Sequence, residues 1–130
     1  MSNQYLRLDE RTMLFSKDML NFCKSQPQTI ITKPIINQLI RSATAIGANY
    51  AEATNASSRL DFRNKIYVAK KETAETKYWL ALMLEHASDK NTCIALFEES
   101  HYILMTFQRI ANSLNQGQGT KAKARLRAKG

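Results

Sequence analysis

Apolar side chains recur every three or four residues in four separate stretches of the chain, which is the spacing of one helical face. Charged and polar residues fill the positions between them, and the strict alternation typical of strands never extends beyond a few residues. The pattern predicts amphipathic helices over about residues 9–25, 33–54, 59–87 and 92–115. Short connections between long amphipathic helices favour an antiparallel up-down four-helix bundle, so the predicted fold class is all-α.

Each predicted helix presents one row of residues to the core, with N-caps expected at Thr32, Ser58 and Thr92. Arg11, with other charged residues, is assigned to the polar side of the first helix. The expected core positions are Leu14, Phe15, Met19, Phe22 and Cys23 in the first helix, Ile36, Leu39, Ile40, Ala43, Ile46, Gly47 and Tyr50 in the second, Phe62, Ile66, Ala69, Thr73, Thr76, Leu80 and Leu84 in the third, and Phe97, Leu104 and Ala111 in the fourth.

Composition favours helices and adds an uneven charge. The 130 residues include only four Gly and two Pro, and the net charge is +8. Residues 117–130 hold five Lys or Arg and no acid, so residues 1–116 carry the remaining +3. The sequence therefore predicts a bundle over residues 1–116 and a flexible basic tail over residues 117–130, with Gly117 and Gly119 separating the two.

No apolar run approaches the roughly 18 to 20 residues that a membrane span needs, and the N-terminus lacks the apolar core of a signal peptide. We therefore expect a cytoplasmic protein without membrane contact. In that reducing compartment Cys23 and Cys93 are expected as small buried residues rather than as a disulfide or metal ligands.

Two segments in the second and third predicted helices carry a family resemblance. They read RSATAIGANYAEA, starting at Arg41, and DFRNKIYVAKKETAETKYWLALM, starting at Asp61. With them the chain resembles the small bacterial four-helix-bundle proteins encoded by intervening sequences in 23S ribosomal RNA genes, a family related to the accessory variability protein of diversity-generating retroelements. The residues that carry the resemblance are Arg41, Ser42, Ala48, Asn49, Ala51, Glu52, Phe62, Ala69, Glu72, Glu75 and Trp79.

This resemblance implies an up-down bundle that assembles into a ring-like homopentamer and has no catalytic activity. For the retroelement relative it implies a basic ring that binds a reverse transcriptase and nucleic acid.

The second predicted helix has no charged residue over positions 42–51. Opposite its core positions lie Arg41, Ala45, Ala48 and Glu52. A helix that is apolar nearly all round is typically buried, whereas a four-helix bundle leaves every helix one outer face. We therefore expect self-association to cover Ala45 and Ala48. The alternative is an exposed Ala-rich face with high helix propensity.

The third predicted helix separates its charges into two flanks, for which three interpretations stay open. One is an ordinary solvated face, with each charge contributing little. A second is a head-to-tail interface in which the basic flank of one subunit meets the acidic flank of the next. The third is a ridge of phosphate contacts. The basic flank holds Arg59, Arg63, Lys70 and Lys77, and the acidic flank holds Asp61, Glu72 and Glu75 beside Trp79.

The cations near the C-terminus alternate with other residues. They are Lys121, Lys123, Arg125, Arg127 and Lys129. In an extended chain they would share one side, and in a helix they would spread around it. Two interpretations remain open: a disordered, solubilising end, or a cationic fringe on an oligomer that binds nucleic acid through phosphate contacts.

The sequence contains no pattern of catalytic or metal-binding residues. His86 and His101 lack the helical spacing of metal ligands, and neither a nucleophile elbow nor a phosphate-binding glycine motif is present. We therefore expect no enzymatic activity, cofactor, metal or small-molecule substrate.

Together these observations predict a basic homo-oligomer, a pentamer by resemblance, that binds RNA or DNA mainly through phosphate contacts. The alternative is an adaptor that docks a protein partner such as a reverse transcriptase. A third interpretation is an enzyme whose site forms only between subunits.

Overall fold

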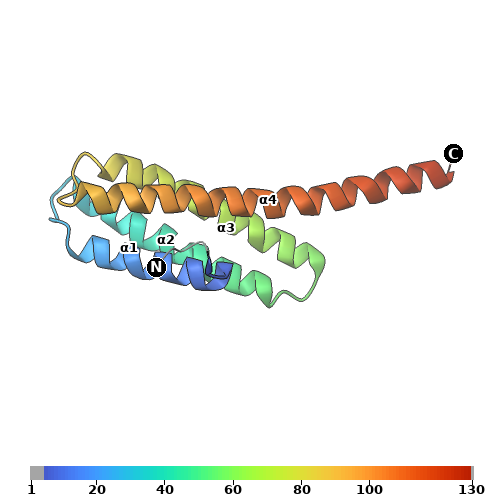
Figure 1. Ribbon diagram of the computed structural model, residues 1–130, viewed down its shortest axis with the longest axis horizontal. Helices are drawn as coiled ribbons and strands as arrows, with labels where there is room; N and C mark the ends of the chain where they lie inside the picture. Colours follow the sequence, from blue (N-terminus) through green and yellow to red (C-terminus); the bar gives the residue numbers. More distant parts are fainter. Residues whose placement is uncertain (1–4, 130) are drawn as a thin grey trace.

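The computed structural model describes the backbone of residues 5–129 and the side chains of residues 5–115. It contains four helices, α1 (Leu8–Lys24), α2 (Thr32–Thr54), α3 (Arg59–Met83) and α4 (Lys90–Lys129). Successive helices run in opposite directions (Figure 1), and residues 5–129 contain no strand. The predicted all-α, antiparallel four-helix bundle is confirmed.

The four helices enclose one core. α1 packs against α2, α2 against α3, α3 against α4, and α4 against α1. Each helix contributes large side chains that are fully buried, such as Met19, Leu39, Leu80 and Phe107. Burial of each such side chain contributes about 1.5 to 3 kcal/mol to folding, so the apolar rows read from the sequence account for the assembly of the bundle.

Helix starts follow capping chemistry, with two corrections. Thr32, the predicted cap of the second helix, is instead the first residue of α2, and the Thr29 hydroxyl oxygen accepts from the backbone N–H groups of Ile31 at 3.2 Å and Thr32 at 3.1 Å.

The starts of α3 and α4 each depend on a side-chain cap. Ser58 caps α3 as predicted, because its Oγ accepts a hydrogen bond of 3.0 Å from the backbone N–H of Asp61. At the start of α4 the predicted cap, Thr92, is wrong. Asp89 takes that role, since its Oδ1 accepts from the Thr92 N–H at 3.1 Å, and an Asp carboxylate satisfies free N–H groups well.

The predicted end of the third helix near Ala87 is four residues too late. α3 ends at Met83 and the following residues form a turn, closed by a 2.9 Å hydrogen bond from the His86 N–H to the Met83 carbonyl. The Gln26 side chain holds the connection to α4, because its Oε1 accepts from the Ser88 N–H at 3.0 Å.

Two residues lie on sides of their helices that the pattern did not predict. Ile40, expected in the core, is 37% exposed because it is turned about 100° from Leu39, which is fully buried. Arg11, expected on the polar side, is only 7% exposed. It precedes the buried Phe15 by four residues and therefore shares its face of α1.

The predicted end of the fourth helix near Asn115 is also wrong. α4 continues through Gly117 and Gly119 to Lys129 and projects beyond the bundle (Figure 1). A glycine costs a helix about 1 kcal/mol relative to alanine, and the Ala, Lys, Arg and Leu residues that follow are strong helix formers. We call residues 117–129 the extension; it adds about 20 Å of helix. The predicted contacts of its cations concern side chains outside those that the structure describes.

Candidate functional site on the two flanks of α3

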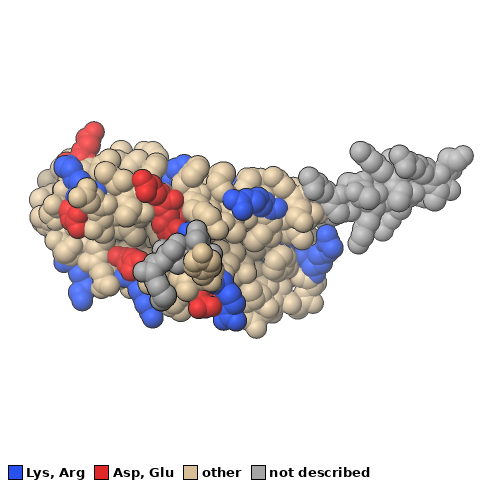
Figure 2. Space-filling model, in the orientation of Figure 1, with Lys and Arg blue, Asp and Glu red and all other residues tan. Residues whose placement is uncertain are grey.

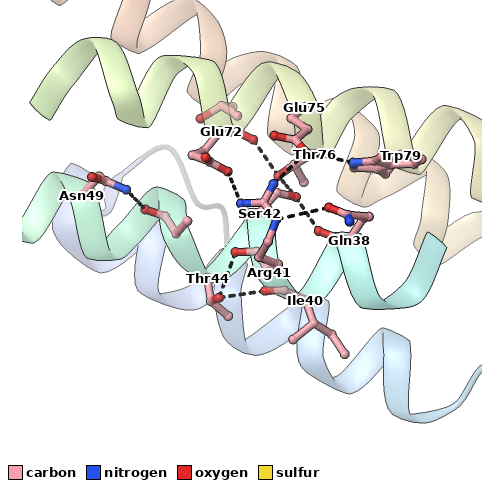
Figure 3. A network of polar contacts seen from close by, with 12 residues as sticks. Gln38, Ile40, Arg41, Ser42, Thr44, Asn49, Glu72, Glu75, Thr76 and Trp79 are labelled. Carbon is pink, nitrogen blue, oxygen red and sulfur yellow. Dashed lines mark hydrogen bonds and ion pairs between the residues drawn. The ribbon is translucent and has the colours of Figure 1, made fainter. Parts of the chain in front are cut away.

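The acidic flank of α3 faces α2, where a single arginine joins two of its carboxylates. Arg41 lies 3.1 Å from Glu72 (Nη1 to Oε2) and 2.7 Å from Glu75 (Nη2 to Oε1), as Figure 3 shows. Its Nε also donates to Gln38 at 3.1 Å. Side-chain exposure is 48% for Arg41 and 14% for Glu72. The arginine therefore covers the carboxylate from the solvent side.

The environment of Glu75 favours its charged form. The Arg41 guanidinium donates to the carboxylate, and the Trp79 indole N–H donates to it at 3.4 Å; together they hold the pKa of Glu75 below its usual value. Further along the same seam, Lys65 pairs with Glu52 at 2.6 Å. The acids Glu52, Glu72 and Glu75 thus have cationic partners within the chain.

Small polar residues lie beneath this network and set the distance between α2 and α3. Ser42 and Thr76 are fully buried, and their hydroxyl oxygens are 2.8 Å apart. The Ser42 hydroxyl donates to the Gln38 carbonyl, and the Thr76 hydroxyl lies 2.8 Å from the Glu72 carbonyl. Every hydroxyl is satisfied, so this pair fixes the register of the two helices without a cost from unpaired polar groups.

The basic flank of α3 faces α4. Lys77 Nζ lies 2.9 Å from His101 Nδ1 and 5.3 Å from the centre of the Phe97 ring. Seven residues towards the N-terminus, Lys70 Nζ lies 5.9 Å from the centre of the Tyr67 ring. The spacing of seven residues places successive cations of this flank about 10.5 Å apart along the helix.

A second cluster lies where α4 leaves the bundle. The Tyr67 hydroxyl and the Asn115 side chain are hydrogen-bonded at 2.9 to 3.1 Å, and the Arg63 guanidinium lies 5.3 Å from the centre of the Tyr67 ring. The hydrogen bond from Asn115, followed by that from Arg63, lowers the pKa of Tyr67 below its usual value. This end of the seam is therefore electropositive.

The side of α4 that meets the basic flank supplies no acid. Between Ser100 and Asn115 the sequence holds one cation, Arg109, and no Asp or Glu. The ion pairs found among residues 5–115 join Arg7, Arg11, Arg41 and Lys65 to acids, and they do not include Lys70 or Lys77. In Figure 2 the end of the bundle from which α4 projects shows Lys and Arg but no acidic side chain on the visible face.

The outer face of α2 borders an open groove against α1. The groove has a volume of about 610 Å³, and Met13, Gly47, Ala48 and Ala51 are among its lining residues. Met13 is 57% exposed. Ala48 and Ala51 are exposed and Ala45 is half-buried. Among the residues that the structure describes, nothing covers the outward side of Ala48.

The six residues predicted for an oligomer interface thus fall on two neighbouring surfaces. Ala48 lies in the α1–α2 groove, and Arg41, Glu52, Glu72 and Glu75 lie along the α2–α3 seam. Ala45 lies between them, where its carbonyl accepts a 2.8 Å hydrogen bond from Asn49.

Sequence reasoning missed a buried ion pair between α1 and α4. Arg11 forms a two-pronged contact with Glu99, 2.9 Å from Nε to Oε2 and 2.7 Å from Nη2 to Oε1. Its guanidinium carbon also lies 3.6 Å from the centre of the Tyr102 ring. The only available signal was the four-residue spacing of Arg11 from Phe15, which places a cation on the apolar face.

The described part of the chain shows few other groups with functional chemistry. Residues 5–115 contain no group of three or more His, Cys, Asp or Glu side chains able to hold a metal ion. Cys23 and Cys93 are buried free thiols, as predicted. None of the described helices is long and apolar enough to cross a membrane.

These features define a small helical bundle. Ion pairs of Arg41 join α2 to α3 on one side of α3, and the seam between α3 and α4 on its other side is basic. Residues 4–116 match the family described as 23S rRNA-intervening sequence protein. The chain belongs to this family, and the predicted family membership is confirmed. The extension lies outside the matched region.

A solved structure supports the same relationship. It is the crystal structure of a protein of unknown function from the S23 ribosomal protein family of Bacteroides thetaiotaomicron VPI-5482, with 30% identity and a TM-score of 0.72. The match covers 81% of this chain and 98% of that chain. No curated protein matches the sequence.

Proposed function

We propose that this protein is a non-enzymatic, homo-oligomeric nucleic-acid-binding protein that contacts RNA or DNA mainly through phosphates. The supporting observation is the position of the basic flank. Lys70 and Lys77 lie on the seam with α4, which has no acid from Ser100 to Asn115 and continues into the basic extension. Arg59, Arg63 and the five cations of the extension complete the proposed phosphate-binding surface.

Phosphate contacts make a specific prediction about salt. Each neutralised phosphate releases counterions, so log K falls with log salt by about 0.9 per contact on duplex DNA and about 0.7 on a single strand. Removal of two contacts is therefore expected to reduce the slope by about 1.4 to 1.8. No base-reading motif accompanies the cations, so sequence preference is expected to be weak.

The test measures binding of a short fluorescent RNA and of a DNA duplex by anisotropy, between about 50 and 200 mM salt. The Lys70→Gln/Lys77→Gln variant is compared with Lys71→Gln/Lys17→Gln, which removes the same charge from exposed positions outside the seam. The proposal requires the slope to fall only in the seam variant. Equal slopes in both variants, or no binding by the full chain, would reject it.

The proposed homo-oligomer, ring-like and pentameric by resemblance, is supported by the apolar groove beside Ala48. A Glu at this position would place a charge in the interface, and its cost would release monomers of 14.8 kDa. Ala48→Glu is a cleaner test than reversal of Glu72 or Glu75, because those carboxylates also hold Arg41 within the chain. Ala74→Glu, which adds the same charge at an exposed position of α3, is the control. Light scattering that gives the same unchanged mass for both variants would exclude this interface.

A second candidate is an adaptor that docks a protein partner such as a reverse transcriptase. It is favoured by Tyr78, which is 59% exposed and packs edge-on against Trp79 with 5.1 Å between ring centres. Tyr and Trp side chains are enriched among the residues that dominate binding energy at protein interfaces. If this candidate holds, Tyr78→Ala abolishes capture of the partner without changing the salt slope for nucleic acid.

A further inference from the structure

An open groove of about 420 Å³ lies between α1 and the first turns of α4. Its floor is apolar, formed in part by Phe15, Phe22 and Leu96, each at most 5% exposed. α1 and α4 make the least extensive of the four helix contacts, which leaves the space between them open at this end. The apolar floor favours a ligand that brings apolar surface of its own.

The sides of this groove carry negative charge. Asp18, Asp89 and Glu99 line it, and the lining includes no Lys or Arg. Arg11 pairs with Glu99 from the bundle side. Burial and the neighbouring charge of Glu99 raise the pKa of Asp18, so a cation bound in the groove would relieve this repulsion. An apolar floor beneath carboxylates fits the stem and head of a Lys or Arg side chain.

The chain itself contains a matching segment. The extension carries five Lys or Arg and no acid, and its backbone continues beyond the ends of α1, α2 and α3 (Figure 1). It also lies beyond residue 116, where the match to the family ends. The family match therefore covers the bundle and does not include the extension.

Geometry prevents the extension from reaching the groove of its own chain. α4 is one continuous helix, the groove lies beside its first three turns, and the extension is at its other end. Glu99 and Lys121 are separated by 22 residues, or about 33 Å of helix. Only the groove of a second copy is within reach.

We propose that the α1–α4 groove is the docking site for the basic extension of a second copy of this chain. The contact is head-to-tail, because the donated extension and the receiving groove are different surfaces; such contacts form rings when the rotation closes and filaments when it does not. The contact does not require nucleic acid, and it uses neither Ala48 nor the basic flank of α3.

The two surfaces match in length and register. The groove follows α1 from Phe15 to Ser25, about 15 Å, and the extension is about 20 Å long. In a helix, positions 121, 125 and 129 fall within 80° of one another and so share one side. These three positions carry cations in the sequence and span about 12 Å, within the length of the groove.

Cross-linking in the absence of nucleic acid tests the contact. Isotope-labelled and unlabelled full-length chains are mixed, treated with a lysine-reactive cross-linker and digested for mass spectrometry. Mixed-isotope peptides are expected to join lysines of the extension to Lys17 or Lys90, the sequence neighbours of Asp18 and Asp89. Asp18→Arg reverses the charge without adding a reactive amine, and it is expected to lower their yield roughly fivefold, the effect of losing one favourable surface charge pair.

Glu85→Arg is the matched control, because it makes the same charge change at an exposed position outside the groove. Asp18→Asn, which keeps the shape of the side chain, is used if the Arg variant melts earlier. The proposal is overturned if mixed-isotope peptides are absent, or if Asp18 variants and the control give equal yields. Nucleic-acid binding measured on the same variants is expected to persist, so a failure of this contact is separate from a failure of the proposed function.

Discussion

Arg41 of α2 and Glu75 of α3 form an ion pair with 2.7 Å between Nη2 and Oε1, and this contact ties the acidic flank of α3 to the neighbouring helix. The folded protein therefore keeps Glu75 ionised to a lower pH than the unfolded chain does. The pKa of its carboxyl is lowered from an ordinary value of 4.5, chiefly by the hydrogen bond from Arg41.

This pair makes the stability of the protein depend on pH in a defined direction. Because the folded pKa is lowered, the stabilisation is present above about pH 4.5 and is lost as pH falls through the folded pKa. Arg41→Gln is expected to reduce the free energy of unfolding by about 0.5 to 1 kcal/mol at pH 7, since the pair is partly exposed, and by less at pH 3. Urea unfolding at both pH values measures this difference. Lys33→Gln, which removes a charge from the same helix, serves as control, and an equal loss at both pH values would contradict the prediction.

The Arg11–Glu99 pair is expected to behave differently because Arg11 is buried and Glu99 is largely covered, at 9% and 14% side-chain exposure. Removal of one partner leaves the other charge poorly solvated and without this ion pair. Glu99→Gln or Arg11→Met is therefore expected to reduce stability by about 3 to 5 kcal/mol. The double variant Arg11→Met/Glu99→Leu is expected to recover much of this loss, because it buries no charge. Urea unfolding of the single and double variants measures the coupling free energy between Arg11 and Glu99. If the loss of stability in the double variant equals the sum of the two single losses, the ion pair does not cause them.

The cap of α3 provides a test with a neighbouring control. Ser58→Ala removes the acceptor for the Asp61 N–H and is expected to cost about 1 kcal/mol. Ser57→Ala changes an exposed hydroxyl one residue earlier and is expected to have an effect within about 0.5 kcal/mol. Thermal unfolding of the two variants compares them directly. Equal melting temperatures would mean that the cap contributes nothing to stability.

The buried thiols are expected to resist modification. Burial, with a smaller effect of Cys93, raises the pKa of Cys23 to about 11 from an ordinary 9.0. At pH 8 this lowers the thiolate fraction roughly hundredfold, and the thiol is also shielded from reagent. A chromogenic disulfide reagent is expected to label both cysteines within minutes in denaturant and neither in the folded protein on that timescale. Fast labelling without denaturant would show that the end of the bundle near Cys23 opens readily.

The sequence allowed the core side and the two charged flanks of α3 to be predicted, because acidic and basic residues lie on different sides of this helix. Glu72 and Glu75 fall on one side of the core row and Lys70 and Lys77 on the other, so the helical angle alone separates the seam with α2 from the seam with α4. The partner of each flank was not predictable in the same way. Arg41 is 31 residues from Glu72, and only the packing of α2 on α3 brings the two together.

Arg11 and the end of α4 show why the remaining predictions were wrong. A buried arginine is stable only with its carboxylate, and that carboxylate, Glu99, is 88 residues away. Local pattern therefore assigns Arg11 to solvent. The glycines at 117 and 119 are weak helix breakers, and the Lys, Ala, Arg and Leu residues over 121–129 are strong helix formers, so the glycines do not set the end of the helix.

The continuity of α4 also has an energetic consequence for whatever binds its projecting end. An isolated peptide of this length would have to initiate its own helix, with an equilibrium constant of about 0.001 for the first turn. In the intact chain the packed part of α4 supplies that first turn, so the extension only propagates a helix that already exists. A partner that requires the extension to be helical consequently binds the folded chain and not the unfolded one. At a concentration about 100 times its Kd, such a partner raises the free energy of unfolding of the whole bundle by about 2.7 kcal/mol, and the melting temperature of the distant core reports its presence.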